Sequence, residues 1–547
     1  MSAELGLAVV SVVDICIKLA NRTLLICQAF RTAKKDLSDK VLLLETIWTK
    51  LETQLAFLRR IKDHLTEELA QCHFDLLQKL QGTLVQAVTQ LEAAASSMNT
   101  STDAGRGHGL SKILQLDRWK YALAKRGLDS LMTELQVWQS LFDPSWYTIM
   151  LIGGKVLDPV LHQSDQDSSR HLPPHGHSSA SPLEHMLALR KAIDYSINTD
   201  IRGIKDIILD ETEWDFTTAT SIAFSSANVV ARTESQHLYL MEGIDTCTTS
   251  DAHQLCKRLQ SVDPSIFGLL RCKGLLEVVH DKATPPGRQI VYHTPVQADP
   301  LKPPTSLRNL LLSQRPVCLS SVVTLAKQLV RSVSFVHTCD LVHKNIRPDN
   351  ILLFPTALAS QRPLELGQAF LVGFSQFRSI NLETNRLGDT AWHRNLYRHP
   401  ARQGLCILER YIMQHDIYSL GVCLLEIGLW RSLVWYPSTS SPTASVSNPA
   451  PGFALQLRKH LCDRDFEHAH LPGATSWVKE DLVLMAQQSL PQRMGQLYTE
   501  IVVDCLTCLD DGNNWLGSWD ETHRQDLVVV GVKFVERILG KVEGITV

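Results

Sequence analysis

The sequence predicts a multidomain protein in which an all-α helical bundle precedes an α+β domain. Leucine-rich stripes fill about the first 160 residues, short β-prone runs begin near Trp214, and helix-prone segments follow from about Leu307. Helices with one apolar stripe bury it against one another, and a small sheet before a larger helical part is typical of an α+β arrangement. We predict a bundle over residues 1–160, a linker with a brace helix over 161–213, and an α+β domain over 214–547.

Length and composition support this division and exclude some functions. The chain has 547 residues and a mass of 61.3 kDa, with 44% hydrophobic and 20% charged residues, which is typical of several globular domains. A net charge of -3 gives no reason to expect a nucleic-acid partner. The thirteen cysteines lack the spacing of a disulfide framework, so we expect reduced thiols. The close pair Cys505 and Cys508 has no second pair beside it, which favours buried structural thiols over a zinc site.

The bundle prediction rests on apolar residues that recur every three or four positions. Such spacing places them on one face of a helix, and this face needs partners. The first stripe contains Leu44, Trp48, Leu51, Leu55, Leu58, Ile61, Leu65 and Leu69, the second contains Phe74, Leu77, Leu80, Leu84, Val88 and Leu91, and the third runs from Ile113 to Trp138.

The opening segment "LGLAVVSVV" is more apolar than one bundle face requires. Asp14 and Lys18 interrupt the apolar run that begins there, so it is neither a convincing signal peptide nor a spanning helix, and we expect a cytoplasmic protein. Two interpretations stay open: a fully buried core helix, or a segment that lies on a membrane surface once it is released. The candidate membrane-active residues are Leu5, Leu7, Val9, Val10, Val13 and Ile17.

Basic residues near this segment are candidates for contact with anionic lipid head groups. Acidic residues in the same helices nearly balance them, which favours an ordinary solvated face for most. These basic residues are Arg31, Lys34, Lys35, Arg59, Arg60 and Lys62.

Two segments have the composition of flexible loops. The stretch from His162 to Pro182 is rich in serine, proline and histidine and has little to bury. Its His171, His175 and His177 suit a metal in principle, but exposed histidines in a linker are the simpler interpretation. The segment from Pro437 to Gly452 is a low-complexity insert.

Four segments in order resemble a protein kinase domain, over about residues 214 to 545. "LVHKNIRPDNILLF" is similar to the catalytic loop and the strand after it, and "AFLVGFSQF" to the strand that leads into the Asp-Phe-Gly motif. "LYRHPARQ" resembles the end of the activation segment, and "HDIYSLGVCLLEIG" the buried helix of the larger lobe. The resemblance implies a two-lobed α+β kinase-like fold. It also implies structural roles for His343, Pro348, Phe374 and Asp416.

The positions that carry kinase chemistry depart from that pattern. The position of the catalytic aspartate is Asn345, whose amide cannot usefully take up a proton. The metal-binding aspartate is replaced by Gly373, and Asn350 is the residual magnesium or nucleotide position. No lysine occurs between Lys205 and Lys257, where the third strand should carry one, and the hairpin before that strand contains no glycine.

These departures predict a pseudokinase: not an enzyme, without a metal site or a required cofactor, and capable at most of weak, metal-independent nucleotide binding. The first alternative is a catalytically active atypical Ser/Thr kinase. It needs a relocated cation, for which Arg232 is a candidate, and a substitute carboxylate, for which Asp349 is a candidate. The second alternative is a passive adaptor scaffold.

The N-terminal region resembles the fungal HeLo domain of heterokaryon-incompatibility and prion-inhibition proteins. The segment that prompts this is "LGLAVVSVVDICIKLANRTLLICQAFRTAKKDLSDKVLLLETIWTKLETQLAFL", and the likeness covers about residues 3 to 150. A bundle followed by a kinase-like domain is also similar to mixed-lineage kinase domain-like proteins. The resemblance implies programmed cell death, in which the kinase-like domain controls a bundle that permeabilises membranes. The expected partners are other signalling proteins, membrane lipid and a second copy of the chain, with relocation to the plasma membrane on activation.

Overall fold

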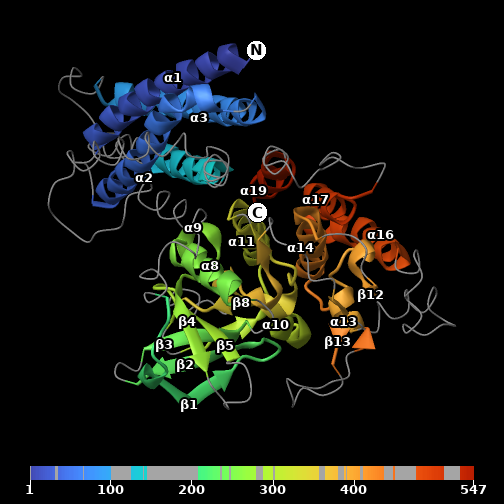
Figure 1. The fold of residues 1–547 in the computed structure, drawn as a ribbon. Helices are drawn as coiled ribbons and strands as arrows, with labels where there is room; N and C mark the ends of the chain where they lie inside the picture. Colours follow the sequence, from blue (N-terminus) through green and yellow to red (C-terminus); the bar gives the residue numbers. More distant parts are fainter. Residues whose placement is uncertain are drawn as a thin grey trace. The chain divides into compact units, whose positions relative to one another are not determined.

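The computed structural model describes most of the chain in two compact units, Met1–Met186 and Leu187–Val547 (Figure 1). The three predicted domain bounds stay a prediction. The described residues are 2–30, 35–65, 67–99, 125–139, 141–143, 207–233, 237–244, 248–278, 287–299, 302–339, 341–356, 364–379, 387–389, 391–406, 411–436, 448–449, 476–510 and 530–547.

Several predicted features lie outside the described residues. They are the linker from His162 to Pro182 with its three histidines, the brace helix, most of the insert from Pro437 to Gly452, the start of the third stripe, and the basic residues Arg31 and Lys34.

The first unit is helical, as predicted. Its elements are α1 (Ser2–Phe30), α2 (Lys35–Arg60), the short 3-10 helix η1 (Lys62–His64), α3 (Glu67–Asn99) and helical residues 125–139 and 141–143. Helix α1 packs against α2 and α3. The core contains Leu44, Trp48, Leu51, Leu55, Leu58 and Ile61 of the first predicted stripe, Leu77, Leu80, Leu84, Val88 and Leu91 of the second, and Leu131, Leu135 and Trp138 of the third.

One predicted continuity is wrong. The first stripe runs in sequence from Leu44 to Leu69, but the helix ends at Arg60 and η1 intervenes. Leu65 then adopts an extended conformation with ψ of 135°, and α3 starts at Glu67. Because Ile61 and Leu69 are both buried on either side of the break, the apolar spacing alone does not reveal it.

Helix α1 buries one stripe and exposes apolar residues elsewhere. Val9 and Val13 are fully buried, whereas Leu5, Val10 and Ile17 are half-buried. Leu7 is 60% exposed and Leu25 is 69% exposed. The helix is therefore not buried all round, and no described helix is long and apolar enough to cross a membrane.

The second unit begins with a five-stranded antiparallel sheet of order β1-β2-β3-β5-β4. The strands are β1 (Trp214–Ser221), β2 (Ala227–Arg232), β3 (Leu238–Gly243), β4 (Cys272–Val278) and β5 (Gly287–His293). Helix α8 (Thr249–Gln260) packs on β4, and the short α9 (Pro264–Phe267) follows it. These strands coincide with the β-prone runs of the sequence.

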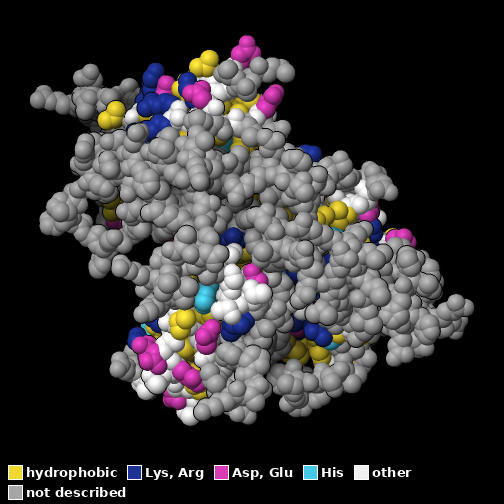
Figure 2. Space-filling view, viewed as in Figure 1, with side chains coloured by type: hydrophobic (Ala, Val, Ile, Leu, Met, Phe, Trp, Pro, Cys, Tyr) yellow, Lys and Arg dark blue, Asp and Glu magenta, His cyan; other side chains and the backbone are white. Residues whose placement is uncertain are grey.

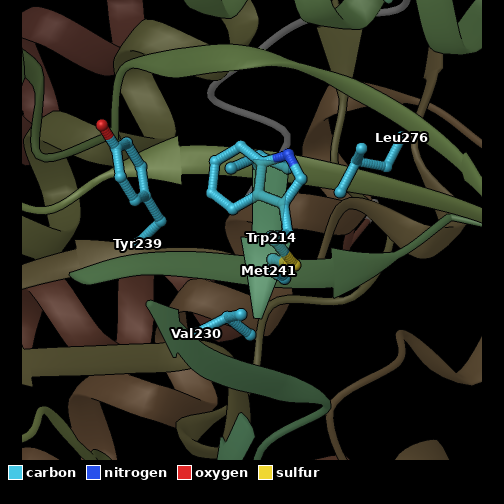
Figure 3. Packing of buried hydrophobic residues seen from close by; sticks show 6 residues of the cluster. Trp214, Val230, Tyr239, Met241 and Leu276 are labelled. Atoms are coloured by element: carbon cyan, nitrogen blue, oxygen red, sulfur yellow. The ribbon is translucent and has the colours of Figure 1, made fainter. Parts of the chain in front are cut away.

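The side chains of β3 alternate between the two faces of the sheet. Tyr239 and Met241 join Trp214, Val230, Leu276 and Val291 in an apolar cluster on one face (Figure 3). Since successive side chains of a strand point to opposite faces, Leu240 and Glu242 point the other way. Both are buried as well, so β3 is covered on both sides.

A larger, mainly helical part completes the second unit (Figure 1). Its longer helices are α10 (Leu307–Ser313), α11 (Leu319–Thr338), α14 (Met413–Leu429), α16 (Ser476–Met494) and α17 (Gln496–Leu506). Shorter helical elements are η3 (Glu211–Glu213), which precedes the sheet, and η4 (Pro348–Asn350), η5 (Phe374–Gln376), α13 (Trp392–Asn395), η6 (Pro400–Arg402), η8 (Val535–Leu539) and α19 (Gly540–Glu543).

Short strands precede and follow several loops of this part. They are β6 (Thr305–Ser306), β7 (Leu341–Val342), β8 (Ile351–Phe354), β9 (Gln368–Leu371), β10 (Arg378–Ser379), β11 (Leu387–Asp389), β12 (Gly404–Cys406), β13 (Val434–Trp435) and β14 (Asn448–Pro449). Strand β8 pairs with β9 and β7 pairs with β10, so the two loops that follow β7 and β9 lie side by side. The predicted fold class, a helical bundle followed by a two-lobed α+β kinase-like fold, is confirmed.

We predict that the bundle loses stability in acid because of His73. This side chain is fully buried, and burial lowers its pKa from 6.5 to about 3. Below pH 6.5 the unfolded chain binds a proton that the folded bundle does not, so the free energy of unfolding should fall as the pH drops from about 6.5 to about 3. The loss is about 1.4 kcal/mol per pH unit for one such group.

Hydrogen exchange of α1 and α3 in the full chain at pH 7.5 and pH 5, corrected for the intrinsic rate, measures this loss. His73→Leu should remove most of the pH dependence, whereas His237→Leu, at an exposed position of the other unit, should leave it unchanged. Equal pH dependence in wild type and His73→Leu would contradict the assignment.

Candidate functional site

The loop after β7 is anchored by the carboxylate of Asp416 on α14. The backbone N–H groups of His343 and Lys344 donate to its two oxygens over 2.7 and 2.9 Å, and the Tyr411 hydroxyl donates over 2.8 Å. His337 Nε2 lies 3.3 Å from the same carboxylate. Burial alone would raise the pKa of Asp416, but these hydrogen bonds and the neighbouring histidines hold it below its usual range. The predicted structural residue is therefore an ionised anchor.

The anchored backbone adopts a conformation that ordinary residues avoid. Lys344 has φ of 64°, in the left-handed region, although it carries a side chain. Such a conformation costs on the order of 1 kcal/mol or more and persists only where the surroundings impose it. The hydrogen bond from the Lys344 N–H to Asp416 provides that constraint. It thereby sets the direction in which the backbone continues through Asn345.

The rings of His343 and Phe374 pack against each other beside this loop. Their ring centroids lie 4.6 Å apart, and both side chains are buried. Burial lowers the pKa of His343 to about 4, so this imidazole is neutral at physiological pH. Pro348 opens η4 at its first position, where its missing N–H costs nothing.

Asn345 and Asn350 meet at Gly373, the residue that follows β9 by two positions and immediately precedes η5. The amide Nδ2 of Asn345 donates to the Gly373 carbonyl over 3.2 Å, and the Nδ2 of Asn350 donates to the Asn345 carbonyl over 2.7 Å. Val372 N–H donates to the Asn350 carbonyl over 2.8 Å. The two positions at which the sequence predicts altered chemistry, Asn345 and Gly373, are thus brought together with the residual magnesium position, Asn350.

Gly373 is required by its own backbone and by its neighbour. Its φ is 95°, and a Cβ atom built on it would lie 2.3 Å from Cγ and 2.4 Å from Nδ2 of Asn350. Asn350 therefore lies where a side chain at 373 would begin. The sequence shows that an aspartate is absent here, and the structure adds that its space is filled.

Glu242, which the sequence motifs do not single out, faces Gly373 from the sheet. Glu242 lies on β3, where a lysine is expected, and its Oε2 accepts a hydrogen bond of 2.9 Å from the Gly373 N–H. Burial raises the pKa of this carboxyl to about 7, although the N–H groups of Gly373, Phe374 and Ser375 oppose the shift. An acidic residue at the end of the otherwise apolar strand "LYLMEG" was the available signal.

Neither candidate for a relocated group is free. Asp349 forms an ion pair with Arg308 at 3.2 Å, and Arg308 also pairs with Glu426 at 3.0 Å. Tyr397 and Ser432 accept hydrogen bonds from the same guanidinium. This buried network joins α10, η4 and α14, so Asp349 has a structural partner.

Arg232, the candidate for the relocated cation, also forms an ion pair. Arg232 Nη2 lies 2.9 Å from Glu213 Oε2 near the start of β1, so its charge is matched within the sheet. The paired thiols of Cys505 and Cys508 are buried, and burial raises the pKa of both. Within the described part of the chain, no three His, Cys, Asp or Glu side chains form a metal-binding group.

The arrangement can hold backbone and amide groups close to a ligand, but its proton chemistry is limited. Asn345 offers hydrogen bonds and no proton acceptor of useful basicity. Hard oxygen atoms that suit magnesium are present on Asn350 and Glu242, and both side chains are buried at Gly373. In phosphoryl transfer, oxygen atoms of this kind position metal ions and phosphates.

Comparisons with known proteins point to kinases. No family model matches the chain. It is 31% identical over 109 residues, 19% of its length, to the "Serine/threonine-protein kinase ATG1" of Mycosarcoma maydis, and covers 10% of that protein. It is 31% identical over 129 residues, 23% of its length, to the "Probable cell division protein kinase ECU11_1290" of Encephalitozoon cuniculi, and covers 36% of it. The chain thus contains a kinase-like domain and spans only a tenth to about a third of these relatives.

These comparisons correct the prediction that the chain is not an enzyme, because both relatives carry the names of kinases. The prediction rests on four differences in the sequence: Asn345, Gly373, the absent lysine and the absent Gly-rich loop. It did not locate Glu242, whose carboxylate lies against the Gly373 backbone. Position 373, which lacks an aspartate in the sequence, therefore has the carboxyl group of Glu242 beside it in the fold.

We predict that Gly373→Ala destabilises the protein more than Gly495→Ala. Both glycines have positive φ, of 95° and 83°, but a Cβ at 495 meets nothing within 4 Å. Gly495→Ala should therefore lower the free energy of unfolding only through the strain of a positive φ in a residue with a side chain, about 1 kcal/mol. The variant at 373 also displaces the buried Asn350, which adds about 1 to 3 kcal/mol. Thermal melting of the full chain tests this, and equal shifts for the two variants would show that Asn350 yields freely.

Proposed function

We propose that this chain is a signalling protein in which the kinase-like domain controls the N-terminal helical bundle, and that the bundle acts on lipid membranes when it is released. The observation that carries the proposal is the division into two compact units, Met1–Met186 and Leu187–Val547. The kinase-like architecture belongs to the second unit, so the first needs a task of its own. The HeLo resemblance makes membrane damage and cell death the expected outcome.

The surface of α1 supports a membrane role. Leu7 and Leu25 are both well exposed and lie 18 residues apart, which is five helical turns and places them on one face. Lys18 lies between them on this face and is exposed. Exposed leucines with a lysine that can reach outward are typical of a helix that lies in a membrane interface.

The charges of the bundle argue against a purely electrostatic attraction to lipid. Figure 2 shows Lys and Arg side chains interspersed with Asp and Glu over the N-terminal helices on the visible face. Arg22 pairs with Glu92 and Arg59 pairs with Asp14 at 3.2 Å. We therefore assign the membrane affinity to apolar contact, with the basic residues contributing less.

Dye release from anionic vesicles tests both parts of this proposal. Residues 1–186 should release the dye, and the full chain should release several-fold less at equal concentration. Leu7→Glu combined with Leu25→Glu should reduce release by residues 1–186 several-fold, because two exposed apolar contacts become charged. Val85→Glu in the same fragment is the control, since this exposed valine lies on α3 instead of α1.

The outcomes separate the two parts. Equal release by fragment and full chain would contradict control by the kinase-like domain. Absence of release by both, with a folded fragment, would contradict membrane action and favour a scaffold that assembles partners.

A second candidate function is phosphoryl transfer by an atypical kinase, and the names of both relatives favour it. In this case Asn345 positions the acceptor hydroxyl by hydrogen bonding, and Asn350 contributes an oxygen ligand. Transfer of labelled γ-phosphate by the full chain, with Mg²⁺ or Mn²⁺, measures the activity. It should be slow and should fall at least tenfold in Asn350→Ala, with Asn309→Ala on α10 as the control. Absence of transfer at saturating nucleotide would exclude this candidate.

A further inference from the structure

The buried carboxylate of Glu242 is incompletely satisfied. The side chain is 1% exposed, Oε2 accepts the Gly373 N–H, and Oε1 accepts no hydrogen bond of normal length in the described part of the chain. The Tyr292 hydroxyl approaches this carboxyl and lowers its pKa, but it supplies no counter-charge. No ion pair joins Glu242 to a described lysine, arginine or histidine. By contrast, the equally buried Glu426 is matched by Arg308. A buried carboxylate normally has a counter-charge or coordinates a metal.

A second orphaned oxygen belongs to Asn350, whose side chain packs against Gly373. Asn350 is fully buried, and its Oδ1 has no partner in the described part of the chain. The assignment of this oxygen is firm, because the other amide atom lies 2.7 Å from the Asn345 carbonyl and must be the N–H donor. Glu242 reaches the N–H of Gly373, whereas Asn350 occupies the direction in which a Cβ would point. Each of the two side chains that pack against Gly373 thus has one unpaired acceptor oxygen.

We propose that Glu242 supplies from β3 the carboxylate that position 373 lacks, and that Glu242 and Asn350 together bind a divalent cation, Mg²⁺ or Mn²⁺, with the phosphates of a nucleotide. Carboxylate and amide oxygens are hard donors that suit these ions. Mg²⁺ is usually held by one or two protein carboxylates and completed by substrate phosphates and water. One carboxylate and one amide therefore fit a cation that arrives with a nucleotide.

This inference replaces the expectation that nucleotide binds without metal. On β3, a carboxylate then takes the place of the positively charged lysine that is expected there. Glu242 would bind the cation, and the cation would bind the phosphates. The inference does not depend on the membrane activity of the bundle or on phosphoryl transfer, because it concerns binding alone.

The first test is Mn²⁺ binding by the full chain, measured as loss of the free-ion EPR signal with and without ADP. Wild type should bind one Mn²⁺ more tightly when ADP is present. Glu242→Gln should weaken this binding at least tenfold, since glutamine keeps an acceptor for the Gly373 N–H but removes the charge. Glu213→Gln, at a half-exposed carboxylate of the same lobe, should bind as wild type does.

Two results would overturn the proposal: wild type that leaves Mn²⁺ free in the presence of ADP, or Glu242→Gln that binds as tightly as wild type. A second measurement on wild type alone covers the case in which the variant does not fold. Fe²⁺ bound in place of Mn²⁺, with ascorbate and peroxide, cleaves the backbone near the metal. Cleavage should map by mass spectrometry to β3 and to the segments around Asn350 and Gly373, and cleavage elsewhere alone would contradict the site.

Discussion

The geometry of the candidate site depends on one buried carboxylate. Asp416 accepts the backbone N–H groups of two successive residues, His343 and Lys344, and the second of these is held in the left-handed region. Without that constraint Lys344 would relax to an ordinary conformation, and the direction of the chain after it would change. Asn345, its bond to the Gly373 carbonyl and the packing of His343 on Phe374 all follow from this direction. A side chain of α14 thus determines a loop more than 70 residues earlier.

Three buried acidic groups of the second unit differ in how their charge is balanced. Asp416 is surrounded by hydrogen-bond donors, and Asp349 is matched by a buried guanidinium. These two hold elements together, and their pKa values lie below the usual range, after burial is offset by their partners. Glu242 has backbone N–H groups but no cation, and burial dominates its pKa. Imperfect satisfaction of a buried polar group marks a place where a ligand can be expected.

Much of the fold could be predicted because its signals are local. The spacing of Leu44, Trp48 and Leu51 determines which face of α2 is buried, and the landmark around Asp416 determines a buried helix. Contacts between distant segments could not be read in this way. Glu242 and Gly373 are 131 residues apart, and Arg308 and Glu426 are 118 apart. No periodicity relates such pairs, because each depends on how the sheet and the helices pack in three dimensions.

The same limit makes the chemistry of the site harder to predict from sequence than the architecture. A motif records which side chain follows which along the chain, so Gly373 counts as a loss wherever the motif is compared position by position. In the folded protein the relevant quantity is which atoms surround a point in space. Glu242 contributes an oxygen there from another element, and Asn350 fills the volume beside it.

The packing of Asn350 against Gly373 also restricts the order in which substitutions can be accepted. Every glycine codon differs by one nucleotide from a codon for aspartate or glutamate, so a carboxylate at position 373 is a single mutational step away. That step places a side chain inside the volume of Asn350, and the tolerance of position 373 is therefore set by the residue at 350. An aspartate at this position therefore requires the Asn350 side chain to shift or to change, which makes the two sites an epistatic pair.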